Sequence, residues 1–348
     1  MRIAFLITKP VISSSDGVLS QMMSWNKGLT DLGHDVEFIS QCKFYDWASY
    51  DVIHLFVFSE FMAEYIDWIY PLNPKIVVSP ILDTTYSRGA IKMLSYWGNE
   101  KLRLHNKYYC LRSLRDKIKM VSVRSEFERS YMIESFGFEE WQVKVLPLSF
   151  GDIAYPIEHN AERENYCFHM SFLADKRKNV KRLIEASAAY DFPLKIAGKI
   201  RSYQEEVKID RWLACSNKAE YIGFLSEEEK VRNYRAAKVF ALPSTNEGVG
   251  LVALEAAVNG ADIVITNFGG PQEYYSNLAK KVNPYSIDEI GKGVRYFLDG
   301  NTFQPQFLDR SLMSSIRLMK KSFVMPSELQ KSIVSRRPLS SFITTMRS

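Results

Sequence analysis

Two glutamates bracket a glycine-rich turn between a predicted strand and a predicted helix. The apolar run of residues 239–242 predicts a buried strand, and helix-forming residues begin at Leu251. Glu247 lies on the intervening loop, whereas Glu255 lies more than one turn inside the helix. A carboxylate at the position of Glu255 can accept two hydrogen bonds from a vicinal diol such as a ribose.

The start of the same helix offers a place for a phosphate. The first backbone amides of a helix have no partner within it and lie at the positive end of the helix dipole. Here they belong to Gly250, Leu251 and Val252, and glycine lets the backbone approach a ligand closely. We therefore expect a nucleotide-sugar site, with the diphosphate at the helix start, the ribose at Glu255, and Glu247 facing the group beyond the diphosphate.

The spacing Glu-Gly-x-Gly-Leu followed by a helical glutamate resembles the motif of the family-four retaining glycosyltransferases. Matching segments occur in the family's order over most of residues 1–300, namely 16–18, 33–36, 177–180, 194–199, 221–226 and 268–273. Each segment alone is a weak signal, but the ordered set is specific. The resemblance implies an α/β protein of GT-B fold, with two doubly wound, Rossmann-like domains that face a central cleft.

The resemblance also implies roles for individual residues. Lys178 would contact the donor diphosphate, Glu247 would orient the donor sugar and Glu255 would bind the ribose, which makes Lys178 and Glu247 the expected catalytic residues. The family's second diphosphate cation, an arginine, is replaced here by Phe172. Arg177 and Lys199 are the candidate replacements.

Further implied residues lie on both sides of the expected cleft. Backbone near Phe224 and Leu225 would line the base of the nucleotide. On the acceptor side the implied residues are Asp16, Gly17 and Asp83. The family usually has a histidine directly before the aspartate that Asp83 matches, whereas this chain has a leucine there.

The expected function is transfer of a hexose from a UDP- or GDP-sugar to a saccharide or lipid-linked hydroxyl acceptor, with retention, in bacterial-type surface polysaccharide or glycolipid assembly. No Asp-x-Asp, Walker, His-Glu-x-x-His or Gly-x-Ser-x-Gly motif occurs, so we expect no metal and no cofactor. Helix amides and basic side chains would neutralise the leaving diphosphate. Two alternatives remain, a non-catalytic sugar-nucleotide-binding partner and a GT-B sugar-nucleotide epimerase.

The organisation of the chain fits two domains. A length of 348 residues exceeds what one core usually organises, and short apolar runs alternate with amphipathic stretches, as in βαβ units. A stretch rich in Pro and Gly, residues 147–165, is the predicted linker. The expected domains are 1–150 for the acceptor and 151–310 for the donor. Residues 311–348 would form a helix that returns to the first domain and a basic tail.

Composition limits the partners and the location. A net charge of +5 is too small to indicate nucleic acid, and four cysteines without a paired motif favour a reducing cytoplasm. The sequence shows neither a signal peptide nor a membrane span. The basic and aromatic segment 92–124 has two interpretations. It is either a solvated helix face or a patch that docks on an anionic membrane, which would place the protein at the inner face of the cell membrane.

Overall fold

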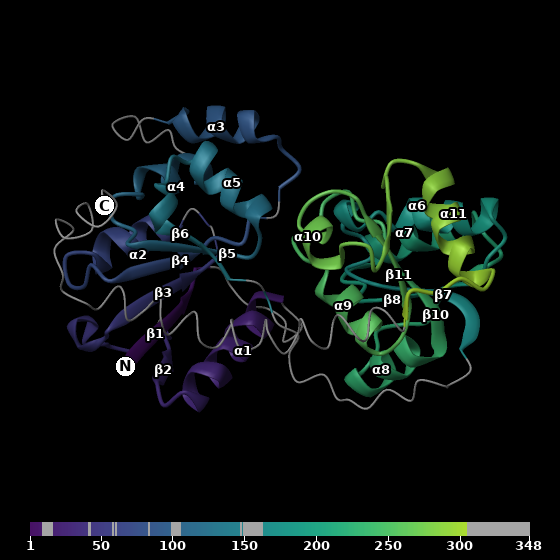
Figure 1. Cartoon of the computed structure of the whole chain (residues 1–348), viewed down its shortest axis with the longest axis horizontal. Helices are drawn as coiled ribbons and strands as arrows, with labels where there is room; N and C mark the ends of the chain where they lie inside the picture. Colours follow the sequence, from purple (N-terminus) through teal and green to yellow (C-terminus); the bar gives the residue numbers. More distant parts are fainter. Residues whose placement is uncertain are drawn as a thin grey trace, which may run out of the picture. The chain divides into compact units, whose positions relative to one another are not determined.

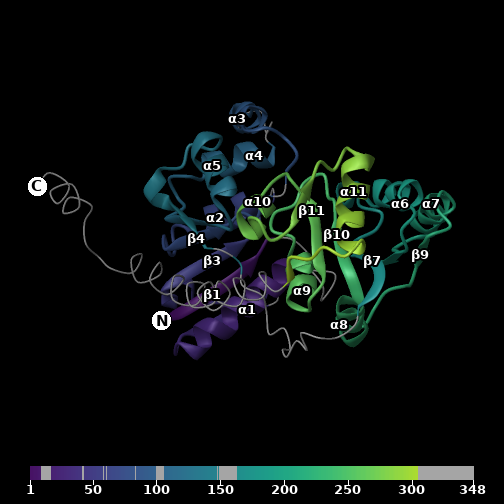
Figure 2. The ribbon, with the colours of Figure 1, turned by 45° about the vertical axis from the view of Figure 1, so that its right-hand side comes forward.

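The computed structural model describes residues 1–8, 17–40, 43–57, 59, 61–82, 84–98, 106–146, 148 and 163–304. Within this part of the chain there are two compact units, one inside Met1–Leu82 and Tyr86–Ser149 and the other inside Asp83–Thr85 and Phe150–Arg317. Each unit is built around a six-stranded parallel sheet, shown in two views in Figures 1 and 2. The predicted α/β class is therefore confirmed.

The sheet of the first unit has the strand order β2-β1-β3-β4-β5-β6. Its strands are β1 (Arg2–Ile7), β2 (Asp35–Phe38), β3 (Val52–Phe56), β4 (Ile76–Ser79), β5 (Met120–Val123) and β6 (Val143–Val145). All neighbouring strands run parallel. Parallel strands need crossover connections, and here most of these contain helices that cover the faces of the sheet.

Helices cover both faces of this first sheet (Figure 1). One face packs on α1 (Gly17–Asp31) through side chains such as Met22 and Trp25. The other face packs on α2 (Phe61–Ile69), α3 (Arg88–Tyr96), α4 (Lys107–Ser113) and α5 (Glu126–Glu134). Two 3-10 turns, Trp47–Ser49 and Glu140–Gln142, lie in the connections.

The sheet of the second unit has the order β12-β11-β10-β7-β8-β9, again all parallel. Its strands are β7 (Glu164–Met170), β8 (Leu194–Ala197), β9 (Ala219–Tyr221), β10 (Ala237–Leu242), β11 (Asp262–Thr266) and β12 (Lys280–Val282). β7 comes first in the chain and pairs with both β8 and β10, so the strand order reverses between β7 and β10. Ligands of doubly wound sheets bind at the carboxyl ends of the strands at this point.

The buried part of strand β10 shows why residues 239–242 are all apolar. Val239 and Ala241 pack into the core shared with α6 (Val180–Ala189), α7 (Tyr203–Leu213) and α11 (Ile287–Leu298). Phe240 points to the opposite face, where its ring lies 5.5 Å from the ring of Tyr234 in α8 (Glu227–Ala236). A strand segment that is covered on both faces is apolar at consecutive positions, as residues 239–242 are.

Two shorter helices complete the second unit. Helix α9 (Leu251–Val258) follows β10 on the face that carries α8, and α10 (Pro271–Tyr275) follows β11. The strand β7 begins at Glu164, so the predicted linker of residues 147–165 extends too far at its end. The predicted terminal helix and tail, residues 311–348, lie outside the described residues. None of the described helices is long and apolar enough to cross a membrane.

The basic segment 92–124 is not one helix face. It contributes part of α3 and the whole of α4 and β5. Arg124 is buried, and its Nε donates to Oε1 of Glu128 at 2.8 Å, so it cannot belong to a surface patch. Tyr108 and Leu114 are buried as well. The sequence reasoning was wrong for these residues because the composition of a segment does not reveal which of its side chains face the core.

Candidate functional site

Two loops meet at the carboxyl ends of β7 and β10. The first loop passes through a 3-10 turn, η3 (Lys176–Lys178), on its way to α6. The backbone amide of Thr245 on the second loop donates to the carbonyl of Arg177 at 2.7 Å. The side-chain amide of Asn179 donates to the carbonyl of Pro243 at 2.9 Å. These bonds join the two loops at the place where the strand order reverses.

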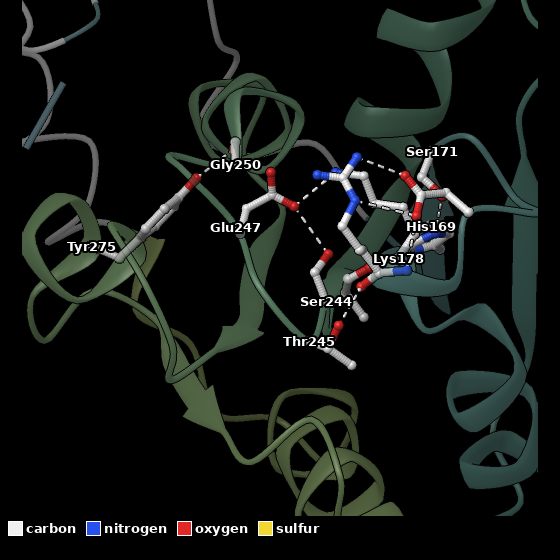
Figure 3. Close-up of polar contacts among 11 residues, drawn as sticks. His169, Ser171, Lys178, Ser244, Thr245, Glu247, Gly250 and Tyr275 are labelled. Atoms are coloured by element: carbon white, nitrogen blue, oxygen red, sulfur yellow. Dashed lines mark hydrogen bonds and ion pairs between the residues drawn. The ribbon is translucent and has the colours of Figure 1, made fainter. Parts of the chain in front are cut away.

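The joined loops bring Lys178 and Glu247 together (Figure 3). Nζ of Lys178 lies 2.8 Å from Oε2 of Glu247, and the hydroxyl of Ser244 donates to the same oxygen at 3.0 Å. The side chains of Lys178 and Glu247 are only 18% and 14% exposed. Residues 69 positions apart in the sequence thus form a shielded ion pair, in which the attraction is screened less than on the open surface.

The backbone of Glu247 is fixed by a second glycine loop. The carbonyl of Glu247 accepts from the amide of Gly270 at 3.2 Å. Gly269 adopts a φ of +83°, and a Cβ at this position would lie 2.3 Å from the carbonyl oxygen of Glu247. Only glycine fits both the conformation and the close approach. The segment 268–273 is one of those that resemble the family, and this close approach explains why it needs a glycine at position 269.

Gly250 starts α9 in a conformation that favours glycine. Its φ is +78°, and its carbonyl accepts from the hydroxyl of Tyr275 at 2.7 Å (Figure 3). The amides of Ala253 and Leu254 also bond to this carbonyl, which closes the first turn. The amides of Leu251 and Val252 come before these bonds, so they are the donors that the helix itself cannot use.

Glu255 lies one turn further along α9 and contacts α8. Its Oε2 accepts from the hydroxyl of Tyr234 at 3.3 Å and lies 3.4 Å from Nζ of Lys230. Burial raises the pKa of Glu255, and the positive charge of Lys230 opposes this rise. The sequence analysis missed Lys230 and Tyr234. The sequence does hold a signal for them. Ser226 marks the start of a helix, and Lys230 and Tyr234 are four residues apart within it, which places them on one face.

His169, also missed, supports the loop after β7. Its Nδ1 lies 2.7 Å from the carbonyl oxygen of Ala241, and its Nε2 lies 2.7 Å from the hydroxyl of Ser171. Burial lowers the pKa of His169 to about 4, so the ring is neutral at neutral pH. A carbonyl can only accept, so Nδ1 carries the hydrogen and Nε2 accepts from Ser171. The ring therefore ties the carboxyl ends of β7 and β10 together.

Phe172, which stands where the family has its second diphosphate cation, has a basic neighbour. Phe172 is 39% exposed, and the guanidinium of Arg201 lies 6.0 Å from the centre of its ring. Arg201 follows β8 and forms an ion pair with Glu205 at 2.6 Å. Of the two replacements expected from the sequence, Arg177 has its Nη2 2.8 Å from Oδ2 of Asp175, and Lys199 is exposed.

Within the second unit, Phe224 and Leu225 do not join this cluster. Phe224 and Leu225 lie on the loop after β9, further along the same edge of the sheet, where Phe224 is 64% exposed. Gly17 is the exposed first residue of α1, and a Cβ there would meet nothing within 4 Å, so no steric reason requires glycine. Asp16 and Asp83 lie outside the described residues.

Known proteins resemble this chain in sequence and in fold. Residues 156–310 match the family model described as glycosyl transferases group 1. The O-antigen chain mannosyltransferase B of Escherichia coli is 22% identical over 213 residues, which cover 54% of this chain and 54% of that protein. The chain thus spans about half the length of this curated relative.

Solved structures resemble the chain over nearly its full length. Sucrose-phosphate synthase from Thermosynechococcus elongatus has a TM-score of 0.72 at 16% identity and covers 96% of this chain and 99% of its own. HepE from Anabaena, solved in complex with UDP and glucose, has a TM-score of 0.67 at 14% identity, with coverages of 95% and 100%. These similarities confirm the predicted architecture of two doubly wound domains.

Proposed function

Because this chain belongs to the group 1 glycosyl transferases and has their GT-B fold, we propose that it transfers a hexose from a nucleoside-diphosphate sugar to a hydroxyl acceptor. The proposal includes retention of the anomeric configuration, which the resemblance to retaining enzymes implies. The observation that carries it is the meeting of Lys178 and Glu247 beside the start of α9, at the reversal of strand order.

Each part of the donor has a proposed partner in the second unit. The ammonium of Lys178 and the amides of Leu251 and Val252 would take the diphosphate. Glu255, one turn inside α9, would accept hydrogen bonds from the ribose, and Glu247 would orient the sugar. This order along the site matches the order of groups along a nucleotide sugar.

The proposed chemistry relies on the leaving group. Negative charge grows on the diphosphate as the bond to the sugar breaks, and fixed donors aimed at that charge lower the barrier. Glu247 forms an ion pair with Lys178 and a hydrogen bond with Ser244, which suits a positioning carboxylate. Catalysis would then come from positioning the acceptor and stabilising the diphosphate, without a covalent intermediate on the enzyme.

Arg201 is the proposed substitute for the missing diphosphate arginine. Phe172 occupies the expected position, and Arg201 places its guanidinium beside that ring from the neighbouring strand end. The pKa of Arg201 is raised, first by its bond to Glu205 and further by the charge of Asp175, which also faces Arg177 and Lys178. Arg201 thus belongs to the same group of charges as the proposed diphosphate lysine.

The similarities support a proposed donor and pathway. A relative is an O-antigen chain mannosyltransferase, and a structural neighbour was solved with UDP and glucose. Both are consistent with a UDP- or GDP-hexose donor and a saccharide or lipid-linked acceptor in surface polysaccharide or glycolipid assembly. As part of the proposal, we place this transfer in the cytoplasm or at the inner face of the membrane.

One face of α3 supports docking on an anionic membrane. Lys92, Met93 and Tyr96 have the spacing of neighbours on one side of α3, and Trp97 directly follows the helix. Met93, Tyr96 and Trp97 are 66%, 57% and 73% exposed, and Lys92 is exposed too. Aromatic and apolar side chains with a basic neighbour fit the boundary between lipid headgroups and acyl chains. We call these four residues the α3 face.

The test of the proposed function is a transfer assay with the purified full chain. UDP- and GDP-hexoses would be supplied with saccharide and lipid-linked acceptors, and NMR would report the anomeric configuration of the product. Transfer with retention supports the proposal. Binding of donor without hydrolysis or transfer favours the non-catalytic partner, and conversion of the sugar nucleotide without an acceptor favours the epimerase.

A further inference from the structure

Glu255 is held through one of its two carboxylate oxygens. Tyr234 donates to Oε2 at 3.3 Å, and Nζ of Lys230 lies 3.4 Å from the same oxygen. Both partners come from α8, where a spacing of four residues puts them on one face. The hydrogen bond and the closest approach of the ion pair both involve Oε2, and within the described part of the chain Oε1 accepts no hydrogen bond.

The partners of Oε2 are themselves rigidly placed. The ring of Tyr234 is fully buried and packs edge-on against Phe168 and Phe240, at centroid distances of 5.7 and 5.5 Å. The side chain of Lys230 is only 16% exposed, and it also pairs with Glu227. Glu255 itself keeps 28% of its side-chain surface exposed. The held oxygen therefore lies toward α8, and the carboxylate still reaches solvent.

We infer that Lys230 is a positioning residue for nucleotide binding, which together with Tyr234 fixes Oε2 of Glu255 so that Oε1 is presented as an ionised acceptor to a vicinal diol. This inference rests on the proposed function, because the diol is the ribose of the donor. Lys230 contacts Glu255 and not the nucleotide. Its role is to keep the carboxylate of Glu255 ionised and to fix its orientation.

The charges around Glu255 explain why a lysine is needed. Burial raises the pKa of Glu255, Lys230 lowers it, and Glu227 raises it further. The other groups that face Glu255 are the hydroxyls of Tyr234 on α8 and Tyr275 on α10, both un-ionised because burial raises their pKa values well above the usual range. Removing Lys230 therefore leaves the carboxylate without a positive partner among these groups. A protonated glutamic acid loses acceptor capacity toward the ribose.

The experiment compares ribose recognition across pH. Isothermal titration of the full chain uses UDP and GDP with their 2′-deoxy and 3′-deoxy counterparts, between pH 6 and 9. We expect the wild-type protein to prefer the ribonucleotide by about tenfold to hundredfold, since a charge-assisted hydrogen bond is lost in the deoxy forms. Lys230→Met should lose this preference at pH 6 and regain it as the pH rises and Glu255 ionises. Lys230→Arg should keep it throughout.

Two controls separate positioning from folding. Tyr234→Phe removes a neutral donor from Oε2 that lowers the pKa of Glu255 less than Lys230 does, so it should reduce the preference with a weaker pH dependence than Lys230→Met. The thermal unfolding temperature of each variant shows whether the unit is intact. A Lys230→Met variant that is folded and keeps the wild-type preference at every pH overturns the inference. So does loss of preference in both Lys230 variants without recovery at high pH.

The inference and the proposed function can fail separately. If the wild-type protein prefers ribonucleotides but Lys230→Met behaves in the same way, only the role of Lys230 is wrong. If the wild-type protein binds neither UDP nor GDP, or binds the deoxy forms equally well, the placement of the ribose at Glu255 is wrong, and the inference falls with it.

Discussion

The ammonium of Lys178 and the carboxylate of Glu247 form an ion pair, with Nζ and Oε2 2.8 Å apart. The residue proposed to bind the diphosphate is therefore bound to the residue proposed to orient the sugar. Ser244 donates to the same carboxylate oxygen at 3.0 Å, which holds Glu247 in place. A diphosphate that binds Lys178 must compete with Glu247 for the ammonium. Substitution of Lys178 and substitution of Glu247 should therefore have opposite effects on nucleotide affinity.

Removing the glutamate should release the lysine. In Glu247→Ala the affinity for UDP or GDP should be equal to or higher than in the wild-type protein, whereas sugar transfer should fall by at least about a hundredfold. In Lys178→Ala the nucleotide affinity should fall by about tenfold to hundredfold, since a charge-assisted bond is lost. Titration calorimetry and a transfer assay on both variants provide the measurement.

Lys181→Ala is the matched control for this pair. Lys181 lies on α6 and forms an ion pair with Glu185 at 3.4 Å, with 57% of its side chain exposed. Its removal should leave nucleotide affinity and transfer unchanged, because exposed pairs contribute little. A nucleotide affinity that falls as far in Glu247→Ala as in Lys178→Ala would show that Glu247 itself binds the nucleotide.

Arg201→Ala should weaken the binding of the diphosphate specifically. We expect a loss of about tenfold in affinity for UDP or GDP, and no loss for the corresponding nucleoside, since only the phosphates meet the guanidinium. The loss should shrink as salt rises, because Arg201 is 58% exposed. Arg211→Ala, at an exposed position on α7, is the control. If wild type and Arg201→Ala bind UDP or GDP with equal affinity at low salt, Arg201 does not contact the diphosphate.

Transfer should not require a divalent metal. The proposed charge stabilisation comes from Lys178 and the amides at the start of α9, and the sequence has no Asp-x-Asp motif. Transfer rates with excess chelator should therefore equal the rates with added Mg²⁺ or Mn²⁺. If activity disappears with chelator and returns with metal, a cation supplies the stabilisation assigned to these groups.

The α3 face should bind anionic vesicles reversibly. Wild-type protein should sediment with vesicles that contain phosphatidylglycerol at low salt and less so at high salt, since the attraction acts within a Debye length. Lys92→Glu combined with Met93→Ser and Trp97→Ser should abolish the sedimentation, because each basic side chain contributes about 1 kcal/mol and the apolar contacts add to it. Tyr203→Ser, an exposed aromatic of the second unit, is the control.

The vesicle experiment can also show that the face is an ordinary solvated surface. That conclusion follows if wild-type protein ignores anionic vesicles at low salt. It follows equally if the triple variant binds them as well as the wild-type protein does. A soluble saccharide would then be the better acceptor.

Sequence patterns predicted the parts of this molecule that depend on local order. The buried strands follow from short apolar runs, and the loop that carries Glu247 follows from its glycines and the helix start after it. At position 269 the residue type itself indicates the geometry, because a glycine is typical of a positive φ and of a close approach to another backbone segment, here that of Glu247.

Other features depend on contacts between distant segments. Nothing near Lys230 or Glu255 in the sequence shows that α8 and α9 place them 3.4 Å apart. Likewise, Arg201 reaches Phe172 only because β7 and β8 are neighbours in the sheet. Arg124 counted as a surface cation in the composition of its segment, but the fold buries it against Glu128. Such pairings follow from packing, which a single sequence does not display.

The central claim is that the second unit binds a nucleoside diphosphate between Lys178 and Glu255. The most direct test titrates UDP, GDP and ADP into wild-type protein, Lys178→Ala and Glu255→Ala, and follows thermal stability and heat of binding. At least one nucleotide should bind the wild type and add about 2.7 kcal/mol of stability at 100 times its dissociation constant. Both variants should lose most of this gain. Wild-type affinity in both Lys178→Ala and Glu255→Ala would contradict the site.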